Sequence, residues 1–310
     1  MQYEDSDQPV YFRQRRYFYY LTGIDFPDCT VTYNIQRDQL RLWIPPERTG
    51  RDVIYNGSTP TPGDILAKYD FDHVNRYGSL EGYLAHFAYR ETGDIFVLHE
   101  DMKPKLPNRL NETTVWSYID HFDTTRLLPA MDASRAIKST HEIELIRTAN
   151  NISARAHINV LRGIKYFENE AQAEAVFTAT SIAAQAKHQA YGVIAGAGEN
   201  ASTLHYIANN EPLKGRQLMC LDAGCEWHCY AADVTRTFPI SGEFTTEAKS
   251  IYDIVAKMQE EVREQGHTFP PPLRFRLHCF MIYAPFAPIS PQIRKSCPLF
   301  FPGHAEIRNY

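Results

Sequence analysis

The stretch LDAGCEWHCYAADVTRTFPISGEFT, residues 221–245, decides the fold of the second half of the chain. It places Asp222 and Asp233 eleven residues apart in a segment that is otherwise apolar and strand-like. Strands normally exclude aspartate, so two of them need a reason. A hairpin that turns near residues 226–228 would lay two strands side by side, and a suitable register would aim both carboxylates into one pocket.

Two carboxylates in one pocket favour a metal site. Ionised carboxylates a few ångström apart repel strongly where the dielectric constant is low, so such a pair persists only if it shares a proton or binds cations. Hard divalent ions prefer oxygen ligands, and a carboxylate pair can hold two of them roughly 3.5–4 Å apart. We therefore favour metal binding over a proton-sharing pair. A structural alternative makes Asp222 a turn former and pairs Asp233 with Arg236.

His205 is the third candidate site residue. It lies in the sequence TLHY, seventeen residues before Asp222, at the end of a strand-like run. A lone histidine is more often structural than catalytic. In the same pocket as the aspartates, however, His205 could hydrogen-bond a reacting amide or its oxyanion.

Composition is typical of a soluble globular protein and excludes several other classes. The chain has 310 residues, with 44% apolar residues, 22% charged residues and a net charge of -5, enough for one large domain or two ordinary ones. No basic cluster argues for nucleic acid, and no stretch approaches the ~20 apolar residues that span a bilayer. The acidic N-terminus is not a signal peptide.

The six cysteines form no CxxC pair and are expected to be free, apolar packing residues, because a C-x4-C-x3-C spacing is no common zinc pattern. Free cysteines without a secretory signal lead us to expect a cytoplasmic protein.

The first part of the chain predicts a small α/β domain. Two strands joined by a polar turn form a hairpin signal, and further strands and helices alternate after them. The expected strands are 29–35, 40–46, 52–57 and 94–100, and the expected helices are 79–93 and 113–122.

A second domain begins near Arg135. Ser139 followed by Glu142 predicts a capping box, and the apolar series after it predicts a long helix that ends at Gly163. An alanine-rich helix is expected over 168–187. The sequence AYGVIAGAGENASTLHY, residues 190–206, then predicts a strand, a glycine-rich turn and a second strand.

The last part differs in kind from everything before it. Residues 265–310 contain eight of the 19 prolines and a single acidic residue, Glu306. Such a segment continues neither helices nor central strands. The expected domains are therefore 1–130, 131–264 and a divergent proline-rich tail at 265–310.

These segments resemble a known family. The pattern D-A-G-x5-Y-x-x-D-x-T-R, residues 222–236, resembles the first metal-binding segment of the creatinase/aminopeptidase group, which has the pita-bread fold. GAGENASTLHY and RAIKSTHEIELIRTAN resemble two more segments of that catalytic domain. FRQRRYFYYLTGIDFPDC, residues 12–29, is similar to the N-terminal domain of fungal Xaa-Pro aminopeptidases of the prolidase type. The resemblance runs from about residue 4 to about residue 261.

The resemblance implies an α/β N-terminal domain followed by a partial α+β pita-bread domain. It implies a metallopeptidase that removes the N-terminal residue before a proline, with two divalent ions, commonly manganese. Asp222 matches a ligand of one metal, Asp233 matches the ligand that bridges both, and His205 matches the histidine that contacts substrate. A metal-bridging hydroxide would be the nucleophile. The partners implied are a peptide with proline in second position and a second copy of the chain, with no nucleic acid and no membrane.

The sequence departs from the family after Asp233. The family uses five ligands, and the last three lie on segments that resemble H-x-x-G-H-x-x-G, T-x-E-P-G and R-x-E-D. None of these occurs after Asp233, and GHAEI at 303–307 lacks the family spacing. The start is also shorter than in family members. We expect an incomplete chain, with a tail read from another frame or an unspliced intron, and little or no peptidase activity.

Three other functions compete with this one. A non-catalytic pita-bread relative could act as a binding or scaffold protein, although such a module has no need of Asp222, Asp233 and His205. Metal-free, creatinase-like hydrolysis is disfavoured by the presence of both aspartates. Methionine aminopeptidase is disfavoured because ~130 residues precede the catalytic part, enough for a separate domain.

Overall fold

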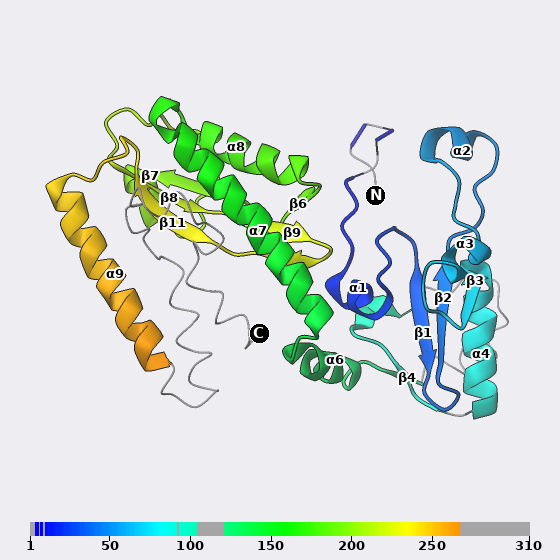
Figure 1. Ribbon diagram of the computed structural model, residues 1–310. Coiled ribbons are helices and arrows are strands. Elements are labelled where there is room, and N and C mark those ends of the chain that lie inside the picture. Colours follow the sequence, from blue (N-terminus) through cyan, green and yellow to red (C-terminus); the bar gives the residue numbers. More distant parts are fainter. Residues whose placement is uncertain (1–3, 6, 9, 92, 104–120, 267–310) are drawn as a thin grey trace. The chain divides into compact units, whose positions relative to one another are not determined.

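A computed structural model describes residues 4–266, apart from residues 6, 9, 92 and 104–120 (Figure 1). The chain divides into two compact units, with the division between Ile137 and Lys138. Each unit has its own buried core. The proline-rich tail and most of the helix expected at 113–122 lie outside the described residues.

The sheet of the first unit has the order β1-β2-β3, with an antiparallel β1–β2 pair and a parallel β2–β3 pair. The hairpin expected from the sequence is confirmed. A second, two-stranded parallel sheet pairs β4 with β5, and its last strand occupies the end of the segment expected as a helix. The strands are β1 (Thr30–Asn34), β2 (Gln39–Ile44), β3 (His73–Arg76), β4 (Ile95–Phe96) and β5 (Phe122–Asp123).

One helix of the first unit corrects a prediction. The strand expected at 52–57 is instead helix α2. Asp52 lies in its first turn and accepts a hydrogen bond from the Asn56 amide at 2.6 Å, a contact typical of i,i+4 neighbours on a helix. The helices are α1 (Arg16–Thr22), α2 (Arg51–Asn56), α3 (Pro62–Leu66), η1 (Tyr77–Ser79), α4 (Leu80–Glu91), η2 (Glu100–Met102) and α6 (Leu127–Ala136).

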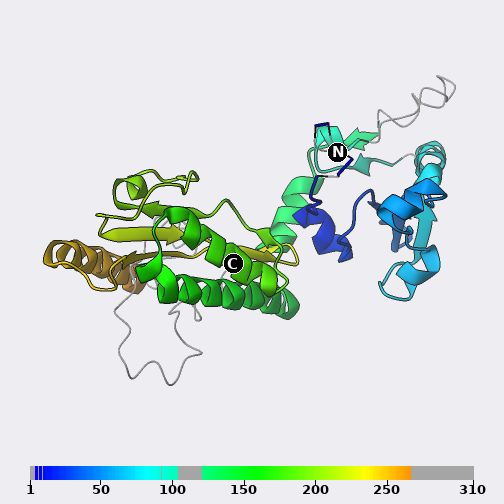
Figure 2. The same cartoon turned by 90° about the horizontal axis from the view of Figure 1, so that it is seen from above.

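The second unit begins with two long helices that pack side by side (Figure 2). The predicted capping box is present, since the Ser139 N–H donates to Glu142 Oε2 at 2.7 Å and the Glu142 N–H donates to Ser139 Oγ at 3.3 Å. The helices of this unit are α7 (Thr140–Gly163), η3 (Ile164–Tyr166), α8 (Glu170–Ala183), η4 (Gly198–Ser202) and α9 (Thr246–Gly266).

Two small antiparallel sheets complete the second unit, in the orders β11-β8-β7 and β10-β9-β6. Apolar side chains of α7 and α8 share one core with the first of these sheets, among them Val160, Phe177 and Leu221. This packing holds the strands that carry the candidate site. The strands are β6 (His188–Gln189), β7 (Ile194–Ala197), β8 (Leu218–Asp222), β9 (Cys225–Trp227), β10 (Tyr230–Ala231) and β11 (Thr235–Pro239).

The second strand expected within 190–206 does not form. After β7 the chain enters the 3-10 helix η4 and then a turn that contains His205. The chain folds back so tightly here that a Cβ on Gly196 would lie 3.0 Å from the Cα of Ala201. The prediction of a second strand was wrong because the residues after β7 form a compact loop and do not pair with a neighbouring strand.

No helix within the described part of the chain is long and apolar enough to cross a membrane.

Candidate metal centre

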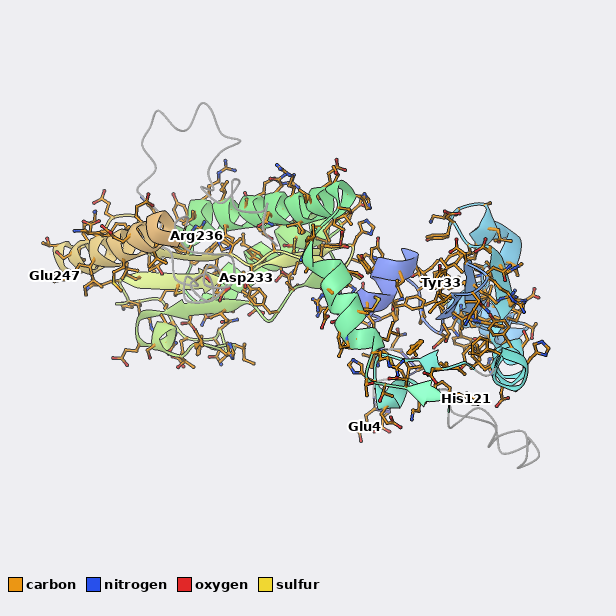
Figure 3. All side chains as sticks on the ribbon, turned by 90° about the horizontal axis from the view of Figure 1, so that it is seen from below. Glu4, Tyr33, His121, Asp233, Arg236 and Glu247 are labelled. Atoms are coloured by element: carbon orange, nitrogen blue, oxygen red, sulfur yellow. The ribbon has the colours of Figure 1, made fainter. Side chains whose placement is uncertain are left out.

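The hairpin expected around the aspartates is present in the structure. Strands β8 and β11 pair antiparallel with Asp222 opposite Thr235, and β9 pairs with β10. The turn falls at His228 and Cys229, both with positive φ angles of 48° and 65°, rather than at 226–228. Asp222 ends a strand and is not a turn former, and Asp233 lies in the segment that leads into β11 (Figure 3).

Gly224 lets the two arms of the hairpin approach closely. A Cβ at this position would lie 1.8 Å from the Ala232 carbonyl oxygen and 3.1 Å from the Asp233 nitrogen. Backbone bonds flank the contact, because the Ala223 N–H donates to the Val234 oxygen at 3.1 Å. Only glycine fits here, and this close approach brings Asp233 back toward Asp222.

A single tyrosine connects the two aspartates. The Tyr191 hydroxyl donates to Asp222 Oδ1 and lies 3.0 Å from Asp233 Oδ1. Asp222 is 7% exposed, whereas Asp233 is exposed to solvent. The structure therefore places both predicted ligands at one point. Tyr191 was not predicted from the sequence, because it follows strand β6 and belongs to no recognised motif.

The electrostatics of this point keep the tyrosine protonated. Burial and the hydrogen bond to Asp222 raise the pKa of Tyr191 far above its usual value. Burial also raises the pKa of Asp222, and the charge of Asp233 raises it further, whereas the Tyr191 hydroxyl and the charge of His205 lower it. The Thr235 hydroxyl also lowers the pKa of Asp222, although its oxygen meets hydrogen-bond geometry with no described residue.

His205 lies in the turn after η4 and is exposed. Its charge is close enough to Asp222 to lower the pKa of that carboxyl. Within the described residues its ring makes no hydrogen bond, so the backbone of the loop sets its position. The structure therefore brings His205 to the neighbourhood of Asp222 but leaves it free to meet another molecule.

His157 supports the hairpin from helix α7. Its side chain is 1% exposed, and its Nε2 donates to the Ala223 carbonyl at 3.0 Å. The ring of Phe177 lies edge-on at 5.2 Å. Nδ1 meets hydrogen-bond geometry with no described residue, whereas Nε2 faces a carbonyl oxygen, so the neutral Nε2–H form fits this place. Burial lowers the pKa of His157 to about 4.

We expect His157 to make the fold sensitive to acid. Its pKa is about 6.5 in an unfolded chain and about 4 in the folded one. Between these values the unfolded chain binds more protons, so stability falls as the pH drops through this window, by about 3 kcal/mol in total. His157→Gln keeps a donor for Ala223 and cannot titrate. Urea unfolding between pH 7 and pH 4 should show a shallower loss for this variant.

The matched control for this measurement is His141→Gln, at an exposed position near the start of α7. It should keep the acid sensitivity of the parent chain. Equal pH dependence of His157→Gln and the parent chain would contradict the role given to His157.

The donor set fits part of a divalent metal site. Asp222 and Asp233 supply carboxylate oxygens, and Thr235 supplies a buried hydroxyl without a described partner; hard cations such as Mn²⁺ prefer such ligands. The described residues contain no group of three or more His, Cys, Asp or Glu that could hold a metal ion. The two carboxylates therefore need further ligands to complete a site.

Among the described residues, Cys220 and Cys225 belong to no group of metal-binding side chains. Cys225 is buried, and its sulfur contacts Ser153 Oγ and the Ala149 oxygen at 3.4 Å each. Burial raises the pKa of Cys225 and raises that of Cys220 to about 11, so both are thiols at neutral pH rather than the thiolates that zinc needs. These two thiols pack in the core, as the sequence indicates.

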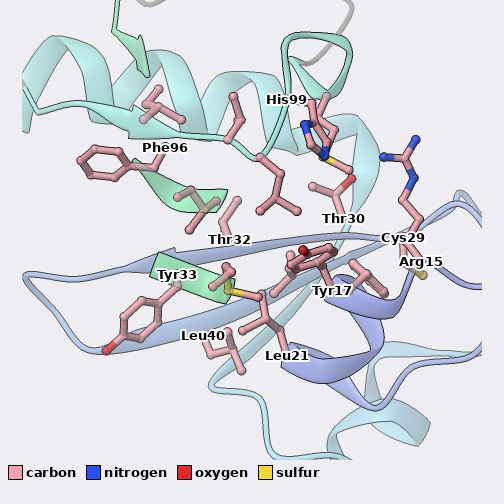
Figure 4. Close-up of a pocket in the computed structure, with 18 of the residues that line it drawn as sticks. Arg15, Tyr17, Leu21, Cys29, Thr30, Thr32, Tyr33, Leu40, Phe96 and His99 are labelled. Atoms are coloured by element: carbon pink, nitrogen blue, oxygen red, sulfur yellow. The ribbon is translucent and has the colours of Figure 1, made fainter. Parts of the chain in front are cut away.

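A large cavity lies elsewhere, within the first unit. It has a volume of about 1740 Å³ and is lined mainly by apolar side chains such as Leu21, Leu40 and Phe96 (Figure 4). Its polar lining includes Arg15 and Asp101, which pair with each other at 3.7 Å. None of the three predicted site residues lines it. We therefore place the candidate chemistry at the hairpin and not in this cavity.

Comparisons with known proteins match both units. Residues 144–268 match Metallopeptidase family M24, and residues 1–96 match the Aminopeptidase P, N-terminal domain. The chain is 62% identical over 267 residues to a Sclerotinia sclerotiorum protein named "Probable Xaa-Pro aminopeptidase", covering 84% of this chain and 48% of that protein. It is 49% identical over 260 residues to an Aspergillus clavatus protein of the same name, covering 83% and 51%. The chain thus spans about half the length of these relatives.

Solved structures show the same likeness. Zn-substituted E. coli aminopeptidase P in complex with product matches with a TM-score of 0.69 and 25% identity, over 84% of this chain and 60% of that one. A variant of the E. coli protein matches with a TM-score of 0.72 and 25% identity, over 84% and 61%.

Proposed function

Because the chain belongs to metallopeptidase family M24, with an aminopeptidase P N-terminal domain before a partial pita-bread domain, we propose that it derives from an Xaa-Pro aminopeptidase. The substrate would be a peptide with proline in second position. The observation that supports this most is the meeting of Asp222 and Asp233 at the Tyr191 hydroxyl, because carboxylate oxygens are ligands that hard divalent cations prefer.

Each residue has a proposed role. Asp222 would hold one metal ion and Asp233 would bridge two, with Mn²⁺ as the proposed ion. When bound, these cations supply the Lewis-acid chemistry that activates water at neutral pH. Tyr191 would orient Asp222 by donating its one hydroxyl proton to that carboxylate, with Asp233 Oδ1 3.0 Å from the same oxygen. His205, exposed beside Asp222, would donate a hydrogen bond to the amide of the scissile bond.

We further propose that this chain is not an efficient peptidase by itself. The described residues offer no group of three metal-binding side chains, and the sequence after Asp233 lacks the later histidine and glutamate motifs of the family. The cytoplasmic location and the homodimer also stay predictions. A non-catalytic binding protein is the second candidate, and metal binding separates it from the first.

A calorimetric titration with Mn²⁺ tests the proposed metal site. We expect weak, saturable binding to the 310-residue chain. Asp233→Asn should weaken it by about 10-fold or more, because it removes a charge from the ligand set. The matched control is Asp253→Asn, on the exposed side of α9, where the aspartate pairs with Lys249. Absence of saturable binding, or equal affinity in Asp233→Asn, would favour the non-catalytic binding protein.

A further inference from the structure

A buried glutamate at the start of α8 accepts hydrogen bonds from the loop that carries His205. The Glu170 side chain is 0% exposed. Its Oε1 accepts hydrogen bonds from the Ala197 N–H at 2.8 Å and the Asn200 amide at 2.9 Å. Its Oε2 accepts from the Tyr206 hydroxyl at 2.7 Å and the Glu211 N–H at 3.1 Å. All four donors belong to one segment, residues 197–211.

The carboxylate is ionised in this place. Burial alone raises its pKa, but the hydrogen bonds from Asn200, Ala197, Tyr206 and Glu211 outweigh burial and lower the pKa of Glu170 below its usual value. The Arg216 guanidinium adds a positive charge 3.6 Å from Oε1. A buried carboxylate whose acceptor positions are filled holds its neighbours firmly, and removal of one partner leaves costly unpaired groups.

These contacts enclose His205. Asn200 lies before it and Tyr206 directly after it, and both side chains end on the same carboxylate. Asn200 also donates to the Tyr206 hydroxyl oxygen at 3.0 Å, which closes the loop. Because the exposed His205 ring makes no hydrogen bond within the described chain, this loop alone decides where the ring stands.

We infer that Glu170 is a positioning residue, which fixes His205 next to Asp222 by holding Asn200 and Tyr206. It touches neither substrate nor metal and acts only through the loop. The functional importance of this positioning rests on the proposed function, in which His205 contacts the substrate. The positioning of His205 by Glu170 can be measured without peptide or metal.

The test compares Glu170→Gln with Glu168→Gln. In Glu170→Gln, an NH₂ group replaces one carboxylate oxygen. Each of these oxygens accepts hydrogen bonds from a backbone N–H and a side-chain donor, so the new NH₂ group would face other donors. Glu168→Gln removes the same charge from an exposed side chain two residues earlier. For Glu170→Gln we expect hydrogen exchange of amides 198–207 to rise by about 10-fold or more. We also expect the imidazole NMR signals of His205, assigned with His205→Gln, to move toward those of a histidine in an unstructured peptide.

Neither change is expected in Glu168→Gln. A Glu170→Gln protein that is folded and shows the parent exchange rates and His205 signals would overturn the inference. If that variant does not fold, Tyr206→Phe removes one of the four bonds and should give the same changes in smaller amount; unchanged His205 signals there would overturn it equally. These readouts are independent of the Mn²⁺ titration, so failure of the metal site and failure of the positioning role are distinguishable.

Discussion

Gly224→Ala is expected to lower the free energy of unfolding of the second unit by about 3 kcal/mol or more, which is at or beyond the upper end for overpacking. The added Cβ would lie 1.8 Å from the Ala232 oxygen and 2.5 Å from the Ala232 carbonyl carbon. Both obstacles are backbone, held by the Ala232 N–H bond to the Cys225 oxygen at 2.9 Å. The hairpin must therefore open, and Asp233 must move away from Asp222.

Urea unfolding, followed by circular dichroism, measures this effect. The matched control is Gly192→Ala in the same unit, where a Cβ would meet only the Ile207 side chain at 3.5 Å, an ordinary contact. That variant should lie within about 1 kcal/mol of the parent chain. A Gly224→Ala protein as stable as Gly192→Ala would show that the two arms of the hairpin are not as close as described.

Purified 310-residue chain with Mn²⁺ is expected to release no N-terminal residue from an Xaa-Pro peptide at a rate above that of buffer. Hydrolysis with two metal ions needs enough protein ligands to fix the position and the coordination geometry of both cations. The described part of the chain offers two carboxylates and no larger metal-binding group. Catalytic groups that act as a unit account for rate factors of many powers of ten.

The measurement is release of the free amino acid over hours, with a longer relative assayed in parallel as the positive control. Turnover by this chain within about 10-fold of the relative's, abolished by Asp222→Asn, would refute the expectation. Turnover that survives Asp222→Asn would indicate a contaminating peptidase.

Local patterns were predicted well where neighbours in the sequence decide the structure. The capping box of Ser139 and Glu142 follows from a spacing of three residues and is present at the start of α7. The hairpin that joins Asp222 to Asp233 follows from two apolar runs and a short connection. Its turn was misplaced by one or two residues, because neither His228 nor Cys229 is a glycine, the residue that most readily marks positive φ angles in a sequence.

Two segments were mistaken because apolar residues do not determine a period in short runs. Residues 52–57 are helix α2, fixed by local contacts of Asp52. Residues 198–206 are a compact loop, because Glu170, from a distant helix, satisfies donors that a strand would offer to a neighbour. In the first segment a contact within the run accompanies the helix, whereas in the second a partner outside the run decided the structure.

By itself, the sequence determined the family of the chain, the two helices and the hairpin of its second unit, and the choice of Asp222, Asp233 and His205 as candidates. The tertiary structure alone decided what surrounds them. Tyr191 reaches Asp222 across 31 positions of the chain, and His157 reaches Ala223 across 66. The physical reason is that hairpins and caps form between near neighbours, whereas buried polar groups take their partners from whichever elements the packed core brings together.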